Sequence, residues 1–338
     1  MKKVGLVGYG YWGPNLLRNF VSTPDCEVLY CCDIQLSRIK EIRKKFPSII
    51  VTSNYQDLLD DKELDGIVIA TPTKLHFPLA KLALENGKDV LIEKPMTLTT
   101  QESAELIAIA NKQSRIIMVD HTFLFNEPIR KLKSIIDSGE IGDILYIDSV
   151  RTNLGLFQKD SNAIFDLATH DFSIIQYLLG TSPEWLQAFG QSHYSDQEDV
   201  CYVYAQYPKK ISAHLHVSWL SPLKVRKMII VGTKKMITYD DIEVAEKIRI
   251  YEKGVDFEKM TGKDSQEIRI NYRSGDILTP NLKITEALGL LAREFVSAMN
   301  SRTVTISDGK FGAEVVKLLE SSTESMRLGK KVMFKSKQ

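Results

Sequence analysis

The chain has 338 residues, a length that suggests about two domains, and 43% of them are hydrophobic and 26% charged, as in ordinary soluble proteins. The formal net charge is +1, so no overall field favours nucleic acid or an anionic membrane surface. No apolar run is long enough for a membrane span, and the first strand begins too early to leave room for a signal peptide. The four cysteines have neither metal-ligand spacing nor the number typical of a disulfide framework. We therefore expect a cytoplasmic protein with reduced thiols, no metal, and no nucleic-acid or membrane partner.

The first twenty residues predict a strand, a glycine-rich turn and a helix in direct succession. The apolar run from Val4 to Val7 is typical of a buried parallel strand, and a helix is predicted over residues 13–21. Between them, Gly8, Gly10 and Gly13 have the spacing G-x-G-x-x-G. In such a turn the first glycine permits the tight bend, the second lets a pyrophosphate approach the backbone, and the third lets the helix pack closely. The N–H groups at the start of the helix would then face the phosphates.

An acidic residue strengthens this interpretation, because a glycine triplet alone is a weak signal. A second strand, predicted over residues 27–32, ends in Asp33, about twenty residues after Gly13. A carboxylate at that point can accept hydrogen bonds from both ribose hydroxyls of a dinucleotide. It would also repel a 2′-phosphate, so we expect NAD in preference to NADP; the nearby Arg38 keeps NADP as the alternative.

Strands and helices alternate through the first third of the chain. Strands are predicted over 3–7, 27–32, 66–70, 89–92 and 116–119, and helices over 13–21, 35–46, 75–85 and 99–112. Thr99 and Glu102 have the spacing of a capping box at the start of the helix predicted over 99–112. Such alternation predicts a doubly wound parallel sheet, in which ligands bind beyond the carboxyl ends of the strands.

The pattern changes near residue 122. Strands are then predicted over 144–153, 185–194, 200–207, 211–219, 227–231, 236–239, 248–252 and 267–272, and helices over 127–138, 164–179, 281–299 and 308–328. Several of these strands alternate polar and apolar residues, which is typical of antiparallel sheets with one solvated face. We therefore predict an α/β protein: a Rossmann dinucleotide-binding domain over residues 1–122, and an α+β domain with a large, mainly antiparallel open sheet over residues 123–338.

Two groups of residues are candidates for chemistry. Lys94 follows an apolar strand and precedes Pro95, so its cation would lie at a strand end where cofactor and substrate bind and could take part in proton transfer. A surface lysine in a turn is the alternative. Asp166 and His170 are four residues apart in a predicted helix, so they share a face, and the carboxylate could orient the imidazole for general acid–base catalysis. An ordinary helix-surface pair is the alternative there.

Other chemistries receive less support. His214 and His216 share a strand face, but no carboxylate or cysteine has a spacing that would complete a metal site. Neither a G-x-S-x-G nucleophile turn nor a G-x-x-x-x-G-K-[ST] phosphate loop is present. Lys224 and Arg226 would share a strand face and could hold a substrate phosphate, although a solvated basic edge is the alternative.

Taken together, these segments resemble the glucose–fructose oxidoreductase / inositol dehydrogenase / MocA family over nearly the whole chain. The motifs that carry the resemblance are Gly8-Tyr9-Gly10-Tyr11-Trp12-Gly13, Thr71-Pro72-Thr73 with His76, Glu93-Lys94-Pro95, Ile135-Ile136-Asp137-Ser138-Gly139-Glu140-Ile141-Gly142 and Asp166-Leu167-Ala168-Thr169-His170-Asp171. The resemblance implies a nicotinamide-dependent oxidoreductase acting on a sugar or cyclitol hydroxyl. It also implies a cis Lys94–Pro95 bond and a homodimer or homotetramer formed through the sheet of the second, substrate-binding domain.

The resemblance assigns roles to individual residues. The catalytic residues would be Lys94, His170 and Asp166: His170 or Lys94 would take the hydroxyl proton, and Asp166 would orient the histidine. The cofactor-binding residues would be Gly8, Gly10, Tyr11, Trp12, Gly13, Asp33, Arg38, Thr71, Pro72, His76, Glu93, Lys94 and His121.

The segment Tyr11-Trp12-Gly13-Pro14-Asn15-Leu16 looks most like family members tied to nucleotide-sugar biosynthesis, some of which oxidise position 3 of a UDP-activated sugar. We therefore expect a dehydrogenase of a nucleotide-activated sugar in polysaccharide or glycan biosynthesis. A dehydrogenase of free sugars or inositol and a non-catalytic dinucleotide-binding sensor are the alternatives. Candidate substrate residues are Arg151, Asn153, Lys224 and Arg226.

Overall fold

The structure is a computed structural model that describes residues 1–155, 157, 161–259 and 268–334. The chain forms two compact units, one of Met1–Asn126 with Thr285–Glu320 and one of Glu127–Ile284 with Ser321–Gln338. The first unit is thus formed by two separate segments of the chain, and most of the second unit lies between them in the sequence.

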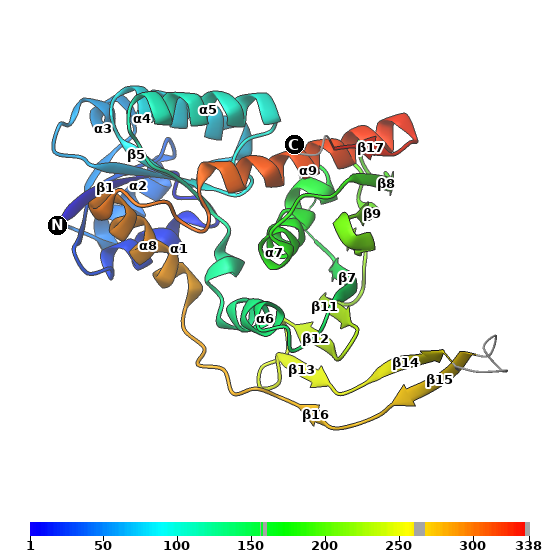
Figure 1. Cartoon of the computed structure of the whole chain (residues 1–338). Helices are drawn as coiled ribbons and strands as arrows, with labels where there is room; N and C mark the ends of the chain where they lie inside the picture. The colour runs from blue at the N-terminus through cyan, green and yellow to red at the C-terminus, as the bar shows by residue number, and fades with distance from the viewer. Residues whose placement is uncertain (156, 158–160, 260–267, 335–338) are drawn as a thin grey trace. The chain divides into compact units, whose positions relative to one another are not determined.

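The first unit contains a parallel sheet of six strands in the order β3-β2-β1-β4-β5-β6, flanked by helices (Figure 1). The strands are β1 (Lys2–Val7), β2 (Cys26–Cys32), β3 (Ile50–Thr52), β4 (Gly66–Ile69), β5 (Asp89–Glu93) and β6 (Ile117–Asp120). The helices are α1 (Gly13–Val21), α2 (Leu36–Lys45), α3 (Gln56–Asp60), α4 (His76–Glu85), α5 (Thr100–Lys112), α8 (Ala287–Ser301) and the start of α9 (Gly309–Leu328), with short 3₁₀ turns η1 (Thr73–Leu75) and η2 (Thr122–Phe125). The predicted Rossmann fold is confirmed.

Local sequence explains the central elements of this unit. Every residue of β4, β5 and β6 is buried, as expected for strands covered by helices on both faces. Helix α5 begins with the predicted capping box: the Thr99 side chain accepts from the Glu102 N–H while the Glu102 carboxylate accepts from the Thr99 N–H.

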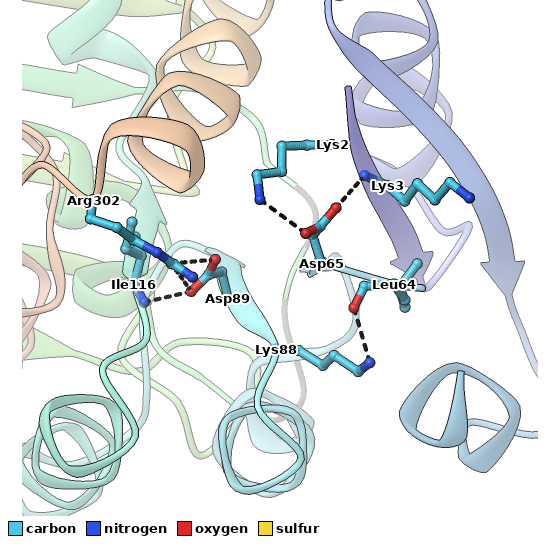
Figure 2. Close-up of polar contacts among 8 residues, drawn as sticks. All are labelled: Lys2, Lys3, Leu64, Asp65, Lys88, Asp89, Ile116 and Arg302. Atoms are coloured by element: carbon cyan, nitrogen blue, oxygen red, sulfur yellow. Dashed lines mark hydrogen bonds and ion pairs between the residues drawn. The ribbon is translucent and has the colours of Figure 1, made fainter. Parts of the chain in front are cut away.

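Polar contacts fix the amino ends of the strands (Figure 2). Asp65, just before β4, accepts from the Lys3 N–H at 2.8 Å and from Lys2 Nζ at 3.0 Å. Asp89 at the start of β5 is 1% exposed and accepts from Arg302 Nη1 at 2.6 and 2.7 Å. These contacts stabilise the end of the sheet where the strands begin. The expected ligand-binding end, at the carboxyl ends of the strands, lies opposite.

Helix α8 corrects the predicted domain division. We predicted that all of residues 123–338 form the second domain, whereas Thr285–Glu320 belong to the first unit. The physical reason is packing: Phe295 of α8 lies edge-to-face on Phe20 of α1, with ring centroids 6.2 Å apart. Arg18 Nη2 also donates to Glu286 just before α8, at 2.5 Å. An amphipathic helix packs against the part of the protein that buries its apolar face, whatever its place in the sequence.

The second unit contains a mainly antiparallel sheet, as predicted. In its described part, strands pair in the order β16-β13-β12-β11-β7-β10-β9-β8-β17, and only β7 and β10 pair in parallel. The strands are β7 (Ile144–Thr152), β8 (Trp185–Gln191), β9 (Val200–Gln206), β10 (Ser212–Ser218), β11 (Val225–Gly232), β12 (Met236–Asp240), β13 (Ile248–Tyr251), β16 (Ile277–Leu278) and β17 (Val332–Met333). The helices are α6 (Glu127–Asp137) and α7 (Thr169–Leu179), the latter preceded by a π-helical turn, η3 (Ile164–Ala168), and a 3₁₀ turn η4 covers Pro208–Lys210.

A two-stranded ribbon of β14 (Gly254–Lys259) and β15 (Ile268–Arg273) extends beyond this sheet (Figure 1). Strand β15 corresponds to the strand predicted over 267–272, of which Glu267 lies outside the described residues. Across the ranges that the structure describes, no helix combines the length and apolar character needed to cross a bilayer.

Candidate functional site

The three glycines of the first loop serve different purposes. Gly8 has φ +95°, and a Cβ there would lie 2.5 Å from the Ala70 carbonyl oxygen. A Cβ on Gly13 would lie 2.3 Å from the Gly8 oxygen. Close packing of the backbone therefore requires glycine at both positions. Among the residues that the structure describes, a Cβ on Gly10 would meet nothing closer than the Arg38 guanidinium at 3.9 Å, so there is space beside Gly10.

The start of α1 lies directly after this loop. Trp12 is its N-cap residue and makes no side-chain capping hydrogen bond, and Pro14 occupies the first turn. The Asn15 and Leu16 N–H groups already donate to the Trp12 carbonyl oxygen, at 3.0 and 3.1 Å, and Pro14 has no N–H. The helix start can therefore attract an anion mainly through the helix dipole. The Tyr11 and Trp12 rings lie on the surface of the loop, 81% and 43% exposed, with centroids 5.5 Å apart.

Asp33 holds the glycine loop against the end of β2. Its buried carboxylate accepts from the Tyr9 N–H at 2.7 Å and from the Gln35 N–H at 2.8 Å. Arg38 Nη1 donates to the same group at 3.2 Å. Asp33 therefore anchors the glycine loop, a role that sequence reasoning did not foresee.

The turn after β4 is fixed by His76. Its ring nitrogens lie 2.9 Å from the carbonyl oxygens of Thr71 and Pro95, and burial lowers its pKa. His76 thus ties two loops together. The Thr71 hydroxyl oxygen is buried and has no hydrogen-bond partner among the described residues, and Pro72 follows it at the N-cap of η1.

Lys94 lies at the carboxyl end of β5. Its N–H donates to Glu93 Oε2 at 3.1 Å, and the Lys94–Pro95 peptide bond is cis, as expected. Glu93 is the register partner of Asp120 at the end of β6. Burial raises the pKa of both carboxyl groups, and for Glu93 the charge of Asp120 raises it further.

His121 follows Asp120 and is 1% exposed. Its ring packs edge-to-face on Phe311 at 5.5 Å, and neither ring nitrogen has a hydrogen-bond partner in the described part of the chain. Burial lowers the pKa of His121 to about 3, so the ring is neutral near pH 7. Buried polar atoms without partners are uncommon in folded proteins. Those of Thr71 and His121, together with the space beside Gly10, fit a ligand with many polar groups lying across the strand ends, as a dinucleotide does.

In the second unit, Asp166 and His170 lie on the helix predicted over 164–179, but the geometry around them is not a plain α-helix. Asp166 belongs to the π-helical turn and His170 to the first turn of α7. Trp219 Nε1 donates to Asp166 Oδ2 at 3.0 Å. The Phe165 N–H donates to Asn162 Oδ1 at 3.1 Å at the start of this segment. Single π turns inside α-helices frequently occur at functional sites.

The four candidate substrate residues differ in their surroundings. Arg151 is buried and donates to both carboxylate oxygens of Asp171, at 2.8 and 3.0 Å. Arg226 is partly exposed and pairs with Asp241 at 3.2 Å. Asn153 is partly exposed, and Lys224 is exposed and precedes β11, outside the strand face we predicted for it. Arg151 is thus occupied within the fold, whereas the other three lie at the surface of this unit.

Sequence reasoning assigned no role to Asp120, Asp171 or Trp219. Asp120 follows a predicted strand next to His121, at a strand end where a ligand is expected. Asp171 directly follows His170, but nothing in the sequence pairs it with Arg151, and Trp219 is brought to Asp166 by the fold alone. Within the described ranges, no cluster of three or more His, Cys, Asp or Glu side chains could hold a metal ion.

Comparison with known proteins agrees with this geometry. Residues 2–121 match the family model described as "Oxidoreductase family, NAD-binding Rossmann fold", and residues 129–238 match the GFO/IDH/MocA C-terminal domain. The chain therefore belongs to the GFO/IDH/MocA oxidoreductase family, and its first unit is an NAD-binding Rossmann domain.

Individual relatives match only in part. The uncharacterized oxidoreductase YrbE of Bacillus subtilis is 31% identical over 198 residues, 55% of this chain and 56% of the relative. Inositol 2-dehydrogenase of Salmonella typhimurium is 30% identical over 182 residues, 52% of this chain and 54% of the relative. The alignments thus span about half of each protein. The structure of UDP-N-acetylglucosamine 3-dehydrogenase GnnA from Acidithiobacillus ferrooxidans superposes with a TM-score of 0.80 at 22% identity, covering 96% of this chain and 98% of that one. At that identity the likeness shows the fold alone.

Proposed function

We propose that the protein is an NAD-dependent dehydrogenase that oxidises a ring hydroxyl of a nucleotide-activated sugar, as a 3-dehydrogenase, in polysaccharide or glycan biosynthesis. The observation that carries the proposal is Lys94, held by its backbone at the carboxyl end of β5 in an NAD-binding sheet. The segment from Tyr11 to Leu16 favours a nucleotide-linked substrate. Arg226, Lys224 and Asn153 are candidates for holding the diphosphate or the sugar.

The residues have separate roles in this proposal. NAD, when bound, supplies the hydride acceptor. Oxidation of a hydroxyl to a ketone also releases one proton, and Lys94 or His170 takes it as general base. Asp166, fixed by the Trp219 indole, would stabilise the imidazolium form of His170 and orient its ring. Glycines 8, 10 and 13 and the start of α1 bind the pyrophosphate, and Thr71 and His121 offer buried polar groups to the cofactor.

We infer that NAD is preferred over NADP because Asp33 is a buried carboxylate beside the glycine loop. A 2′-phosphate would meet its negative charge. Arg38, the residue that would otherwise favour NADP, already donates to Asp33 and is partly neutralised by it.

The substrate class is tested by following NAD reduction with UDP-sugars, other activated sugars, free sugars and inositol. We expect turnover with an activated sugar and at least tenfold lower kcat/KM with the free sugars. The second candidate, a dehydrogenase of free sugars or inositol, is favoured by the 30% identical inositol 2-dehydrogenase. Turnover on a free polyol alone would establish that candidate, and NAD binding without turnover on any substrate would favour a sensor.

The role of Lys94 is tested by Lys94→Ala. We expect turnover to fall by at least a thousandfold while NAD still binds, as measured by fluorescence titration. Lys81→Ala is the matched control, because that lysine is partly exposed on α4 and pairs with Glu105. Turnover of Lys94→Ala within a few-fold of the unmodified enzyme would contradict the mechanism.

We also infer a homodimer or homotetramer formed through the second unit's sheet, in a reducing cytoplasm. One face of this sheet exposes aromatic side chains, among them Phe189, Tyr202 and Tyr204, 59%, 43% and 39% exposed. Exposed apolar patches of this kind are typical of protein interfaces. Light scattering after size-exclusion chromatography measures the oligomeric state, and a monomer at micromolar concentration would contradict the inference.

A further inference from the structure

One end of the second unit's sheet brings three loops together. Gln191, Val200, Ser218 and Thr152 are successive register partners across β8, β9, β10 and β7 at this end. Strands β7 and β10 run parallel, so both leave the sheet here, and β8 is followed here by the loop that leads into β9. The segments after Thr152 and Ser218 therefore lie beside the loop 192–199.

Trp219, directly after β10, connects these loops with Asp166. It is completely buried, and its indole N–H donates to Asp166 Oδ2 at 3.0 Å. Its backbone N–H donates to the Asp199 carbonyl oxygen, and its own carbonyl oxygen accepts from the Gly155 N–H, both at 2.9 Å. A Cβ on Gly155 would lie 2.8 Å from Trp219 Cδ1, so glycine at this position lets the loop after β7 lie against the indole ring.

Two further aromatic rings form a row that begins at Trp219. The Phe157 ring is tilted against the Trp219 ring with centroids 5.4 Å apart, and the Tyr194 ring lies edge-to-face on Phe157 at 6.0 Å. Exposure rises along the row, from 0% for Trp219 to 37% for Phe157 and 78% for Tyr194. The outer rings therefore add little to the core, and most of the Tyr194 ring is open to a ligand.

The loop that carries Tyr194 is anchored by a buried carboxylate. Asp199 is completely buried; its Oδ2 accepts from the His193 N–H at 2.8 Å, and its Oδ1 lies 2.7 Å from His193 Nδ1. Tyr194 is the next residue, so its backbone is fixed although its ring is exposed. A tyrosine held in this way offers contact area at a low cost in conformational entropy.

A cation stands at the same end of the sheet. Lys224 is exposed and precedes Val225, the register partner of Thr152 at the end of β7. The Thr152 hydroxyl donates to the Leu223 carbonyl oxygen at 3.4 Å, which keeps the turn before β11 against this strand end. A phosphate bound beside this end would meet the positive charge of Lys224.

The arrangement fits a substrate that carries a second ring. Nucleobases stack on aromatic side chains, and the stacking tolerates any base because every base has a flat π-face. The rings of Trp219 and Phe157 separate Tyr194 from the carboxylate that Trp219 holds. A free sugar oxidised beside that carboxylate has no second ring to place on Tyr194, whereas a nucleotide-activated sugar has one, joined to the sugar through a diphosphate.

We propose that Phe157 and Tyr194 form a subsite that stacks the nucleobase of a nucleotide-activated sugar, with Lys224 beside its diphosphate. The identity of the substrate rests on the proposed function, whereas the binding of a nucleotide at these two rings does not. Both residues bind the substrate away from the reacting atoms, so they contribute to KM more than to the chemical step.

Calorimetric titration tests the subsite without turnover. UDP is titrated into the complete chain at saturating NAD, so that the dinucleotide site is filled, and inorganic pyrophosphate is the ligand without a base. We expect UDP to bind at least tenfold more tightly than pyrophosphate. Tyr194→Ala and Phe157→Ala should each lose about tenfold in UDP affinity, because each removes a stacking ring. Tyr194→Phe keeps the ring and should bind UDP as the unmodified protein does.

Tyr272→Ala is the matched control, because it removes a tyrosine of similar exposure, 81%, from the ribbon. Its UDP affinity should be unchanged. Tyr194→Ala should keep the NAD affinity and the melting temperature of the unmodified protein, since the ring it removes lies at the surface. Equal UDP affinity in Tyr194→Ala and the unmodified protein, or equal affinities of the unmodified protein for UDP and pyrophosphate, would overturn the proposal.

Turnover separates this proposal from the proposed function. With an activated sugar, Tyr194→Ala should raise KM about tenfold and change kcat much less, and Tyr194→Phe should restore KM. Turnover on an activated sugar with a KM that Tyr194→Ala leaves unchanged would contradict the subsite and retain the proposed function. A protein that oxidises free sugars alone, yet loses UDP binding in Tyr194→Ala, would contradict the proposed function and retain the nucleobase subsite.

Discussion

At the scale of single residues, the glycine loop separates what the fold requires from what a ligand requires. Gly8 and Gly13 are fixed by backbone contacts at 2.5 and 2.3 Å from the positions of their missing Cβ atoms. In the described part of the chain, Gly10 has no such contact. We therefore propose that a pyrophosphate approaches its backbone, and the two kinds of glycine should respond differently to substitution.

We predict that Gly10→Ala folds with an unchanged melting temperature but loses at least tenfold in NAD affinity, because the added methyl group occupies space that the pyrophosphate needs. Gly13→Ala should instead lose about 1–3 kcal/mol of unfolding free energy, because its Cβ overpacks the turn. Calorimetric NAD titration and urea unfolding of the two variants check this. Equal NAD affinity in Gly10→Ala and the unmodified protein would contradict it.

His121 gives a prediction about pH. Burial lowers its folded-state pKa from 6.5 to about 3, so between these values the unfolded chain binds one more proton than the folded one. Unfolding free energy from this group therefore rises with pH by about 1.4 kcal/mol per unit across that window and is lost as pH falls from 6.5 toward 3. His121→Gln should remove this slope, measured by urea unfolding between pH 4.5 and 6.5. His214→Gln, whose side chain is 46% exposed, is the surface control. A slope unchanged by His121→Gln would contradict the prediction.

At the scale of elements, α7 is fixed to β7 by a buried ion pair. Arg151 and Asp171 make two hydrogen bonds with side chains 4% and 3% exposed, and Ser149 Oγ also donates to Asp171 at 3.0 Å. This pair adjoins His170 and holds the helix that carries it.

We predict that Arg151→Met loses about 3–5 kcal/mol of unfolding free energy, because Asp171 is left buried and unpaired. The double variant R151M/D171L should recover part of this loss. Urea unfolding measures both. If Arg151 instead served only the substrate, as we first considered, Arg151→Met would raise KM and leave the unfolding free energy unchanged.

Most regular elements were predictable because their periodicity is local. Helices over 13–21 and 164–179 and the strand over 27–32 agree with the structure to within one residue, since apolar spacing and flanking turn residues define them. Short elements such as β3 (Ile50–Thr52) and α3 (Gln56–Asp60) were missed, because three to five residues carry too little pattern.

Contacts between residues far apart in the chain could not be predicted from the sequence. The parallel pairing of β7 and β10 and the Glu93–Asp120 register arise when distant segments come together. In the candidate site, Lys94, Asp33 and the glycines were found from motifs. The bond from Trp219 to Asp166 and the π turn were not, because they depend on tertiary packing.

At the scale of the whole molecule, the NAD-binding unit is built from two separate parts of the chain. Residues 1–126 supply the sheet, and residues 285–320 supply α8 and the start of α9. Phe295 is completely buried, and Arg302 compensates the buried carboxylate of Asp89. Without the second part, the face of α1 that Phe20 lines would be exposed and the Asp89 carboxylate would lose its cationic partner.

We therefore predict that residues 1–126 alone do not form a stable NAD-binding domain. Joining them through a flexible linker to residues 285–320 should restore cooperative thermal unfolding and NAD binding, because the linker returns α8 to α1 and Arg302 to Asp89. The same fusion carrying Phe295→Ala should lose about 3–5 kcal/mol of unfolding free energy, the usual cost of removing a buried phenylalanine. Circular dichroism melts and NAD titration of the three proteins measure this. If residues 1–126 alone bound NAD as tightly as the intact chain, the nucleotide unit would be sequentially continuous, and α8 would be an accessory helix rather than part of its core.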